Sequence, residues 1–114
     1  MRPPYGYNIF GYTPVQQSAE FDKLFNEIAA EIGADNVYVN RAFAYMIQNQ
    51  NMNLWGSDNA HTNPEGAYLA VCVFFSTLFD TSSTLLDANG LPENTASSLQ
   101  QAADKIVLEQ YKPW

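Results

Sequence analysis

The chain has 114 residues, of which 46% are hydrophobic and 14% aromatic, and this content predicts a folded globular protein. Twelve acidic residues against five basic ones give a formal net charge of −7, which predicts repulsion from nucleic acids and anionic lipid surfaces. A lone cysteine, Cys72, excludes an intrachain disulfide, and the apolar run around it is too short to span a membrane.

The length predicts a single domain over residues 1–114. Residues 1–12 are rich in proline, glycine and tyrosine, which predicts a loop. A helix is predicted over residues 13–33, with Thr13 and Gln16 forming a capping box and Gly33 as a left-handed cap. Apolar residues recur along it at three- and four-residue spacing, so we expect one buried face, made by Phe21, Leu24, Phe25, Ile28, Ala29 and Ile32.

Residues 36–40 alternate two valines and a tyrosine between turn-forming asparagines, which predicts a short strand. A strand in a parallel sheet needs neighbouring strands, and the rest of the chain offers few. The following segment, residues 41–50, has its apolar residues in helical register and is predicted as a short helix, and residues 49–53 are predicted as loop.

Two further helices are predicted in the second half of the chain. The first spans residues 64–79, with Thr62 or Asn63 as its N-cap, and is apolar nearly all the way round, so we expect it to be buried on most sides. The second spans residues 95–111 and places five apolar residues on one side, namely Leu99, Ala102, Ala103, Ile106 and Val107.

The pair Asp58 and His61 is the one arrangement in the sequence that predicts catalytic chemistry. His61 is the only histidine, and a carboxylate three residues upstream can accept a hydrogen bond from one ring nitrogen. The other nitrogen can then take a proton from a nucleophile. Taken without its flanks, Asp-x-x-His is a weak motif, and a helix-capping aspartate beside a surface histidine is the alternative interpretation.

The flanks of this pair strengthen the prediction. After His61 the chain continues as Asn63-Pro64-Glu65-Gly66-Ala67-Tyr68-Leu69 and an apolar helix. This order resembles the last sequence block of the SGNH hydrolases, also called GDSL-type esterases and lipases, most closely over residues 55–79. The resemblance implies a three-layer α/β/α fold, mostly helical in this part with one or two short strands. It also implies serine-esterase chemistry on an acylated carbohydrate or other carboxylic ester, with His61 as base and Asp58 as orienter.

Other parts of the family pattern are absent from these 114 residues. The sequence contains no Gly-Asp-Ser block, no Gly-x-Ser-x-Gly elbow and no Gly-x-Asn-x-x-Asp block. Ser57 and Ser18 are interpreted as ordinary loop and cap serines. The resemblance therefore implies the C-terminal part of such a hydrolase, which holds half of a triad and is not expected to be active alone.

The remaining expectations concern ligands and partners. Trp55 could line a substrate cleft, although packing beside an apolar helix is the commoner fate of such a ring. His61 with Asp58 does not supply the ligands that zinc requires, so no metal is expected, and the resemblance implies no cofactor. The alternative function is a non-catalytic helical binding module, and self-association through exposed apolar surface is a further expectation. The sequence leaves the compartment open, an extracytoplasmic one included.

Overall fold

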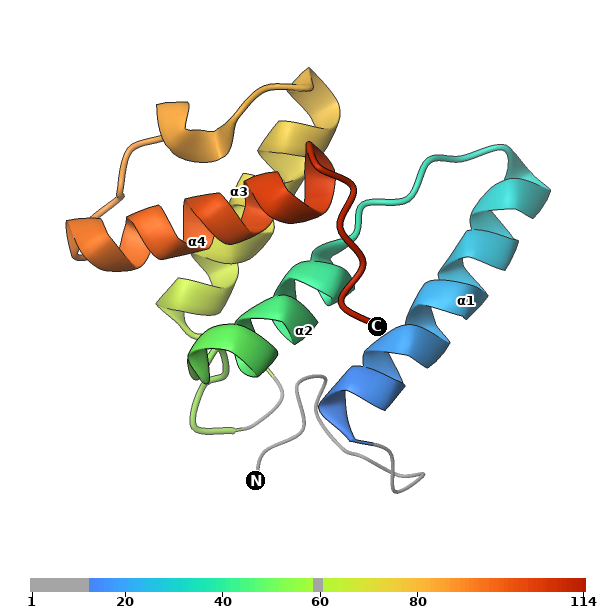
Figure 1. Ribbon diagram of the computed structural model, residues 1–114, viewed down its shortest axis with the longest axis horizontal. Coiled ribbons are helices and arrows are strands. Elements are labelled where there is room, and N and C mark those ends of the chain that lie inside the picture. Colours follow the sequence, from blue (N-terminus) through green and yellow to red (C-terminus); the bar gives the residue numbers. More distant parts are fainter. Residues whose placement is uncertain (1–12, 59–60) are drawn as a thin grey trace.

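The computed structural model describes residues 13–58 and 61–114, and the predicted loop over 1–12 lies outside them. The described chain forms four α-helices and one 3-10 helix (Figure 1): α1 (Pro14–Ile32), α2 (Val39–Gln50), α3 (Pro64–Phe79), η1 (Ser83–Leu85) and α4 (Glu93–Val107). Within these ranges there is no sheet, and the only strand-like pairing is an isolated antiparallel bridge between Trp55 and Thr62. The predicted α/β fold class is therefore wrong: the described chain is all-helical.

The strand predicted over residues 36–40 does not form. Residues 34–38 are irregular, and α2 already begins at Val39. The strand propensity of Val37, Tyr38 and Val39 is overridden because none of the described residues forms a neighbouring strand to accept their backbone hydrogen bonds. Instead, these three side chains are partly buried against the helical core.

The ends of α1 are as predicted. The Thr13 side chain accepts from the Gln16 backbone N–H, and the Gln16 side chain accepts from the Thr13 N–H, which completes the capping box. Gly33 ends the helix in the left-handed conformation, at φ +72°. Both ends follow from local chemistry that needs no tertiary partner.

The buried face predicted for α1 is wrong. Among its described side chains, the buried ones are those of Ser18 and Asp22. Four members of the predicted apolar face are exposed: Leu24, Phe25, Ile28 and Ile32. The periodicity identified the helix correctly but not the face that lies against α2, where the buried side chains are polar.

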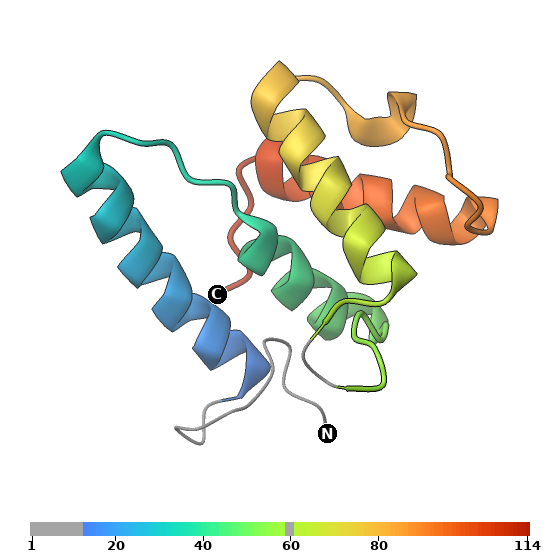
Figure 2. The same ribbon diagram turned by 180° about the vertical axis from the view of Figure 1, so that it is seen from behind.

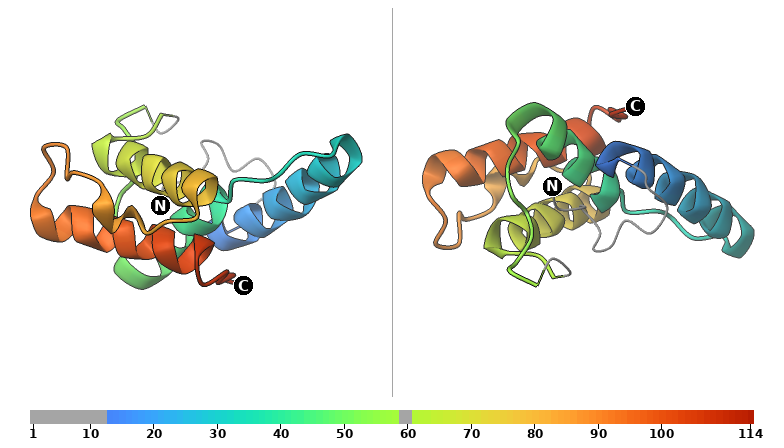
Figure 3. Two further views of the ribbon diagram at one scale, coloured as in Figure 1. Left: turned by 90° about the horizontal axis from the view of Figure 1, so that it is seen from above. Right: turned by 90° about the horizontal axis from the view of Figure 1, so that it is seen from below.

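The hydrophobic core lies where α2, α3 and α4 meet, and includes Met46, Leu69, Val73, Leu99 and Ile106. Figure 2 shows α3 passing in front of α4, while α1 stands beside α2. Among the described elements α1 contacts only α2, and the two views of Figure 3 show it projecting from the α3 and α4 pair.

The helix α3 has the predicted bounds, and its N-cap is Asn63, whose side chain accepts from the Gly66 N–H at 2.9 Å. Only one of its sides is buried, and the expectation of burial on most sides is wrong. One face packs on α4, whereas four large apolar residues are exposed: Val71, Phe74, Leu78 and Phe79.

The last helix is confirmed with shifted bounds, because α4 covers Glu93–Val107 and not residues 95–111. Four of the five residues predicted on its buried side are buried, and Val107 is partly buried. Beyond the helix, Gln110 has a positive φ and the Tyr111 N–H donates to the Lys105 carbonyl, so the chain turns away before Tyr111.

Candidate active site

The candidate site is a loop that connects α2 to α3 and is closed at its base. The Gly56 N–H donates to the His61 carbonyl at 2.8 Å, and the Asn63 N–H donates to the Leu54 carbonyl at 3.1 Å. Asn53 supports this closure, because its carbonyl accepts from the Asn63 side chain at 2.8 Å. The ends of the loop are thereby fixed to the first turn of α3.

Gly66 allows the start of α3 to lie against the other arm of the loop. A Cβ atom at this position would lie 2.3 Å from the Leu54 carbonyl oxygen and 3.1 Å from the Thr62 Cβ. No side chain fits there without moving backbone, so the glycine is required by close approach. This gives a physical reason for the glycine of the Pro-x-Gly sequence that follows the histidine.

Asp58 and His61 are brought together at the tip of this loop. Asp58 Oδ1 accepts from the His61 backbone N–H at 3.0 Å, and Oδ2 lies 2.5 Å from His61 Nδ1. Because an ionised carboxylate only accepts hydrogen bonds, Nδ1 carries the proton of this contact. In the neutral imidazole the lone pair is then on Nε2, which is the arrangement that a general base requires.

The carboxylate also changes the protonation of the imidazole. The hydrogen bond to Asp58 and then its negative charge raise the pKa of His61 above the ordinary value of 6.5. The neutral base therefore forms as the pH rises through this raised pKa. The same attraction contributes to stability below pH 6.5 and is lost as the pH rises through the folded-state pKa.

The surroundings of the pair are open. The His61 side chain is 88% exposed and that of Asp58 50%. Across the described residues no serine hydroxyl is hydrogen-bonded to His61; Ser57 is exposed, and Ser18 is buried and donates to the Asn40 carbonyl. The geometry therefore places a carboxylate and an imidazole in contact at the surface, and no described serine hydroxyl is bonded to that imidazole.

Trp55 lies at the base of the loop, on the core side. Its side chain is buried and meets the ring of Phe43 edge-on, with ring centroids 5.5 Å apart. The structure thus brings Asp58 and His61 together but places the Trp55 ring in the core. A contact between Trp55 and substrate stays a prediction.

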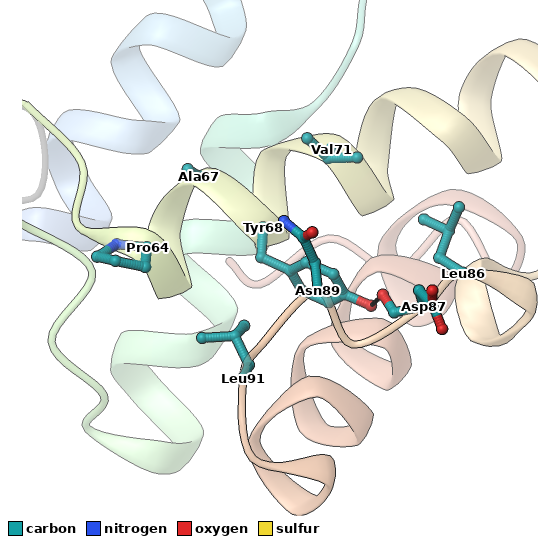
Figure 4. A pocket seen from close by; sticks show the side chains of 8 residues that line it. All are labelled: Pro64, Ala67, Tyr68, Val71, Leu86, Asp87, Asn89 and Leu91. Atoms are coloured by element: carbon teal, nitrogen blue, oxygen red, sulfur yellow. Dashed lines mark hydrogen bonds between the residues drawn. The ribbon is translucent and has the colours of Figure 1, made fainter.

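Two surface cavities of about 390 Å³ lie away from His61. The cavity in Figure 4 is bounded by α3 and the segment before α4, with Tyr68 at its base. The Tyr68 hydroxyl donates to the Asp87 carbonyl at 2.7 Å and accepts from the Gln100 side chain at 2.8 Å. Because these residues are far apart in the sequence, no local motif could have indicated them.

The second cavity lies between residues 36–41 and the C-terminal ends of α3 and α4, and Arg41 and Asp80 help to line it. Within the described ranges, no group of three or more histidine, cysteine, aspartate or glutamate side chains could hold a metal ion. Nor is any described helix both long and apolar enough to cross a membrane.

Comparisons with protein-family models, with curated proteins and with solved structures gave no match for this chain. The resemblance of residues 55–79 to the SGNH block is thus carried by the residues alone.

Proposed function

We propose that Asp58 and His61 are the orienter and general base of an SGNH-type ester hydrolase. The observation that carries the proposal is the contact between His61 Nδ1 and Asp58 Oδ2, which fixes the tautomer and leaves Nε2 as the base. The nucleophilic serine and the oxyanion donors come from polypeptide other than the described residues. The substrate is an acylated carbohydrate or another carboxylic ester.

In the proposed reaction His61 Nε2 removes the proton of the serine hydroxyl as its oxygen attacks the ester carbonyl. The imidazolium, stabilised by Asp58, then gives that proton to the departing alcohol and leaves an acyl-serine. Water then hydrolyses the acyl-serine in the same way. His61 takes a proton from the water molecule while the water oxygen attacks the acyl carbon, and His61 returns the proton to the departing serine oxygen. Asp58 stays ionised throughout.

The test uses the natural gene product, purified by an affinity tag under native conditions together with any polypeptide bound to it. Its hydrolysis of p-nitrophenyl acetate and of a peracetylated sugar is compared between the natural sequence and His61→Ala. We expect kcat/KM to fall at least a hundredfold, since a positioned general base typically contributes about 10²–10⁴ in rate. Equal rates for the two proteins would refute the proposal.

Ser57→Ala is the matched control, because it removes an exposed hydroxyl from the same loop without touching the Asp58 and His61 contact. We expect this variant to keep the full rate. A fluorophosphonate probe would then label a serine elsewhere, and the labelled peptide would identify the nucleophile. Label on Ser57 would contradict the assignment of the nucleophile to other polypeptide.

The alternative function, a non-catalytic helical binding module, is favoured by a different observation. Apolar side chains are exposed on both α1 and α3, among them Ile32 at 70% and Leu78 at 70%. Such surfaces commonly mark sites of protein association. Under this alternative, His61→Ala leaves binding of the partner intact, whereas substitution of the exposed apolar residues abolishes that binding.

A further inference from the structure

The helix α1 is attached to the rest of the described chain through a polar interface. Arg41 on α2 donates to both carboxylate oxygens of Asp22 on α1, at 2.7 and 2.8 Å. The Asn40 side chain also donates to Asp22 Oδ1 at 3.2 Å, and the Ser18 hydroxyl donates to the Asn40 carbonyl at 2.9 Å. Asp22 is only 4% exposed, so this ion pair is largely removed from water.

The residues between α1 and α2 extend this interface. Asn26 on α1 accepts through Oδ1 from the Tyr38 hydroxyl at 2.7 Å and from the Asn36 side chain at 3.1 Å. The guanidinium of Arg41 lies over the Tyr38 ring, 3.7 Å from its centroid. Among the described residues, these hydrogen bonds and the ion pair join α1 to α2 and to the segment before it.

This polar attachment leaves the apolar stripe of α1 unpartnered among the described elements. Phe25, Ile28 and Ile32 follow one another at spacings of three and four residues, and Leu24 lies beside them. Their exposed fractions run from 43% for Ile28 to 70% for Ile32. A stripe with this spacing is the surface on which another helix packs.

One edge of the stripe is acidic. Glu20, Glu27 and Glu31 are exposed, and helical geometry places them along the side of the stripe next to Leu24, away from α2. Lys23 lies on the far side of these glutamates from the stripe, and within the described residues no ion pair joins it to them. The edge therefore presents three carboxylates whose charges are open to a partner.

We propose that α1 is the docking site for an amphipathic helix of another polypeptide that carries lysine or arginine along one edge. Its apolar side chains pack on Phe25, Ile28 and Ile32, and its basic edge faces Glu20, Glu27 and Glu31. A second copy of α1 packed antiparallel would set the acidic edge against itself, and an anionic membrane would be repelled by it. The inference is independent of the ester hydrolase proposal.

The test uses two designed 21-residue helical peptides with leucine at the a and d heptad positions. One has lysine at e and g, and the other has glutamate there; binding to the 114-residue chain is measured by isothermal titration calorimetry. We expect the lysine peptide to bind at least tenfold more tightly than the glutamate peptide. We also expect the affinity to fall at least tenfold in the double variant Ile28→Ser/Ile32→Ser.

Two further variants separate specific docking from attraction to a net charge of −7. Leu78→Ser removes an equally exposed apolar side chain from α3 and should leave the affinity unchanged. Replacing Glu20, Glu27 and Glu31 by glutamine should weaken binding of the lysine peptide and reduce its dependence on salt. Equal affinity of the natural chain and the Ile28→Ser/Ile32→Ser variant would overturn the proposal.

The other occupants of the stripe give distinct results. Dimerisation of the chain alone, measured by light scattering and lost in Ile28→Ser/Ile32→Ser, would assign the stripe to a second copy and contradict the proposal. Co-sedimentation with phosphatidylcholine–phosphatidylglycerol vesicles that is lost in the same variant would assign it to a membrane and contradict it equally.

Discussion

Replacing Gly66 by alanine tests whether the loop that carries His61 is fixed by the close approach of α3. Inside a helix this change normally stabilises a protein by about 0.5–1 kcal/mol. Here the new Cβ would lie 2.3 Å from the Leu54 carbonyl oxygen, and Cβ atoms in proteins essentially never come closer than 3.0 Å to such an atom. The helix start and the loop arm must therefore separate by about 0.7 Å.

Forced repacking of this kind costs about 1–3 kcal/mol, so we expect Gly66→Ala to lower stability despite its better helix propensity. For a chain of this size the loss corresponds to a Tm lower by about 4–12 °C, measurable by circular dichroism. We also expect the ring resonances of His61 to shift, because the loop ends at this contact. Gly33→Ala is the control: it meets no atom within 4 Å, and although its positive φ costs about 1 kcal/mol, it should leave the His61 resonances in place. A Gly66→Ala variant as stable as the natural chain would refute the reasoning.

Three other predictions concern stability and reactivity. Arg41→Ala leaves the buried Asp22 carboxylate without its cation and should cost about 3 kcal/mol in urea denaturation, with faster hydrogen exchange in α1; an unchanged midpoint would contradict the role of the pair. Asn63→Ala removes the N-cap of α3 and should cost about 1 kcal/mol in the same assay, so a loss near zero would argue against the cap. Cys72 is fully buried, and burial raises the pKa of its thiol to about 11, so iodoacetamide at pH 8 should modify it only after unfolding; rapid modification of the folded chain would contradict this burial.

The features that could be predicted from the sequence are those that local chemistry determines. The capping box at Thr13, the left-handed cap at Gly33 and the start of α3 at Pro64 each depend on residues within a few positions of one another. The contact between Asp58 and His61 belongs to the same class, because three residues separate the two side chains. No distant part of the fold is needed to bring them together.

The features that could not be predicted depend on distant residues. Asp22 is paired with Arg41, 19 positions away, and this pair lies on the face of α1 that points toward α2. The apolar periodicity of α1 indicates a face that needs a partner but does not say where that partner is. Likewise, Val37 and Val39 have strand propensity, but no described strand lies beside them, and they pack on helices instead.

The most direct test of the central claim is a nuclear magnetic resonance titration of His61, which is simple to assign because the chain has one histidine. We expect a pKa above 6.5 in the natural chain, a lower pKa in Asp58→Asn, and at high pH a proton on Nδ1 with Nε2 unprotonated. An ordinary pKa that Asp58→Asn does not change, or a neutral ring protonated at Nε2, would show that Asp58 does not orient the imidazole and would contradict the account.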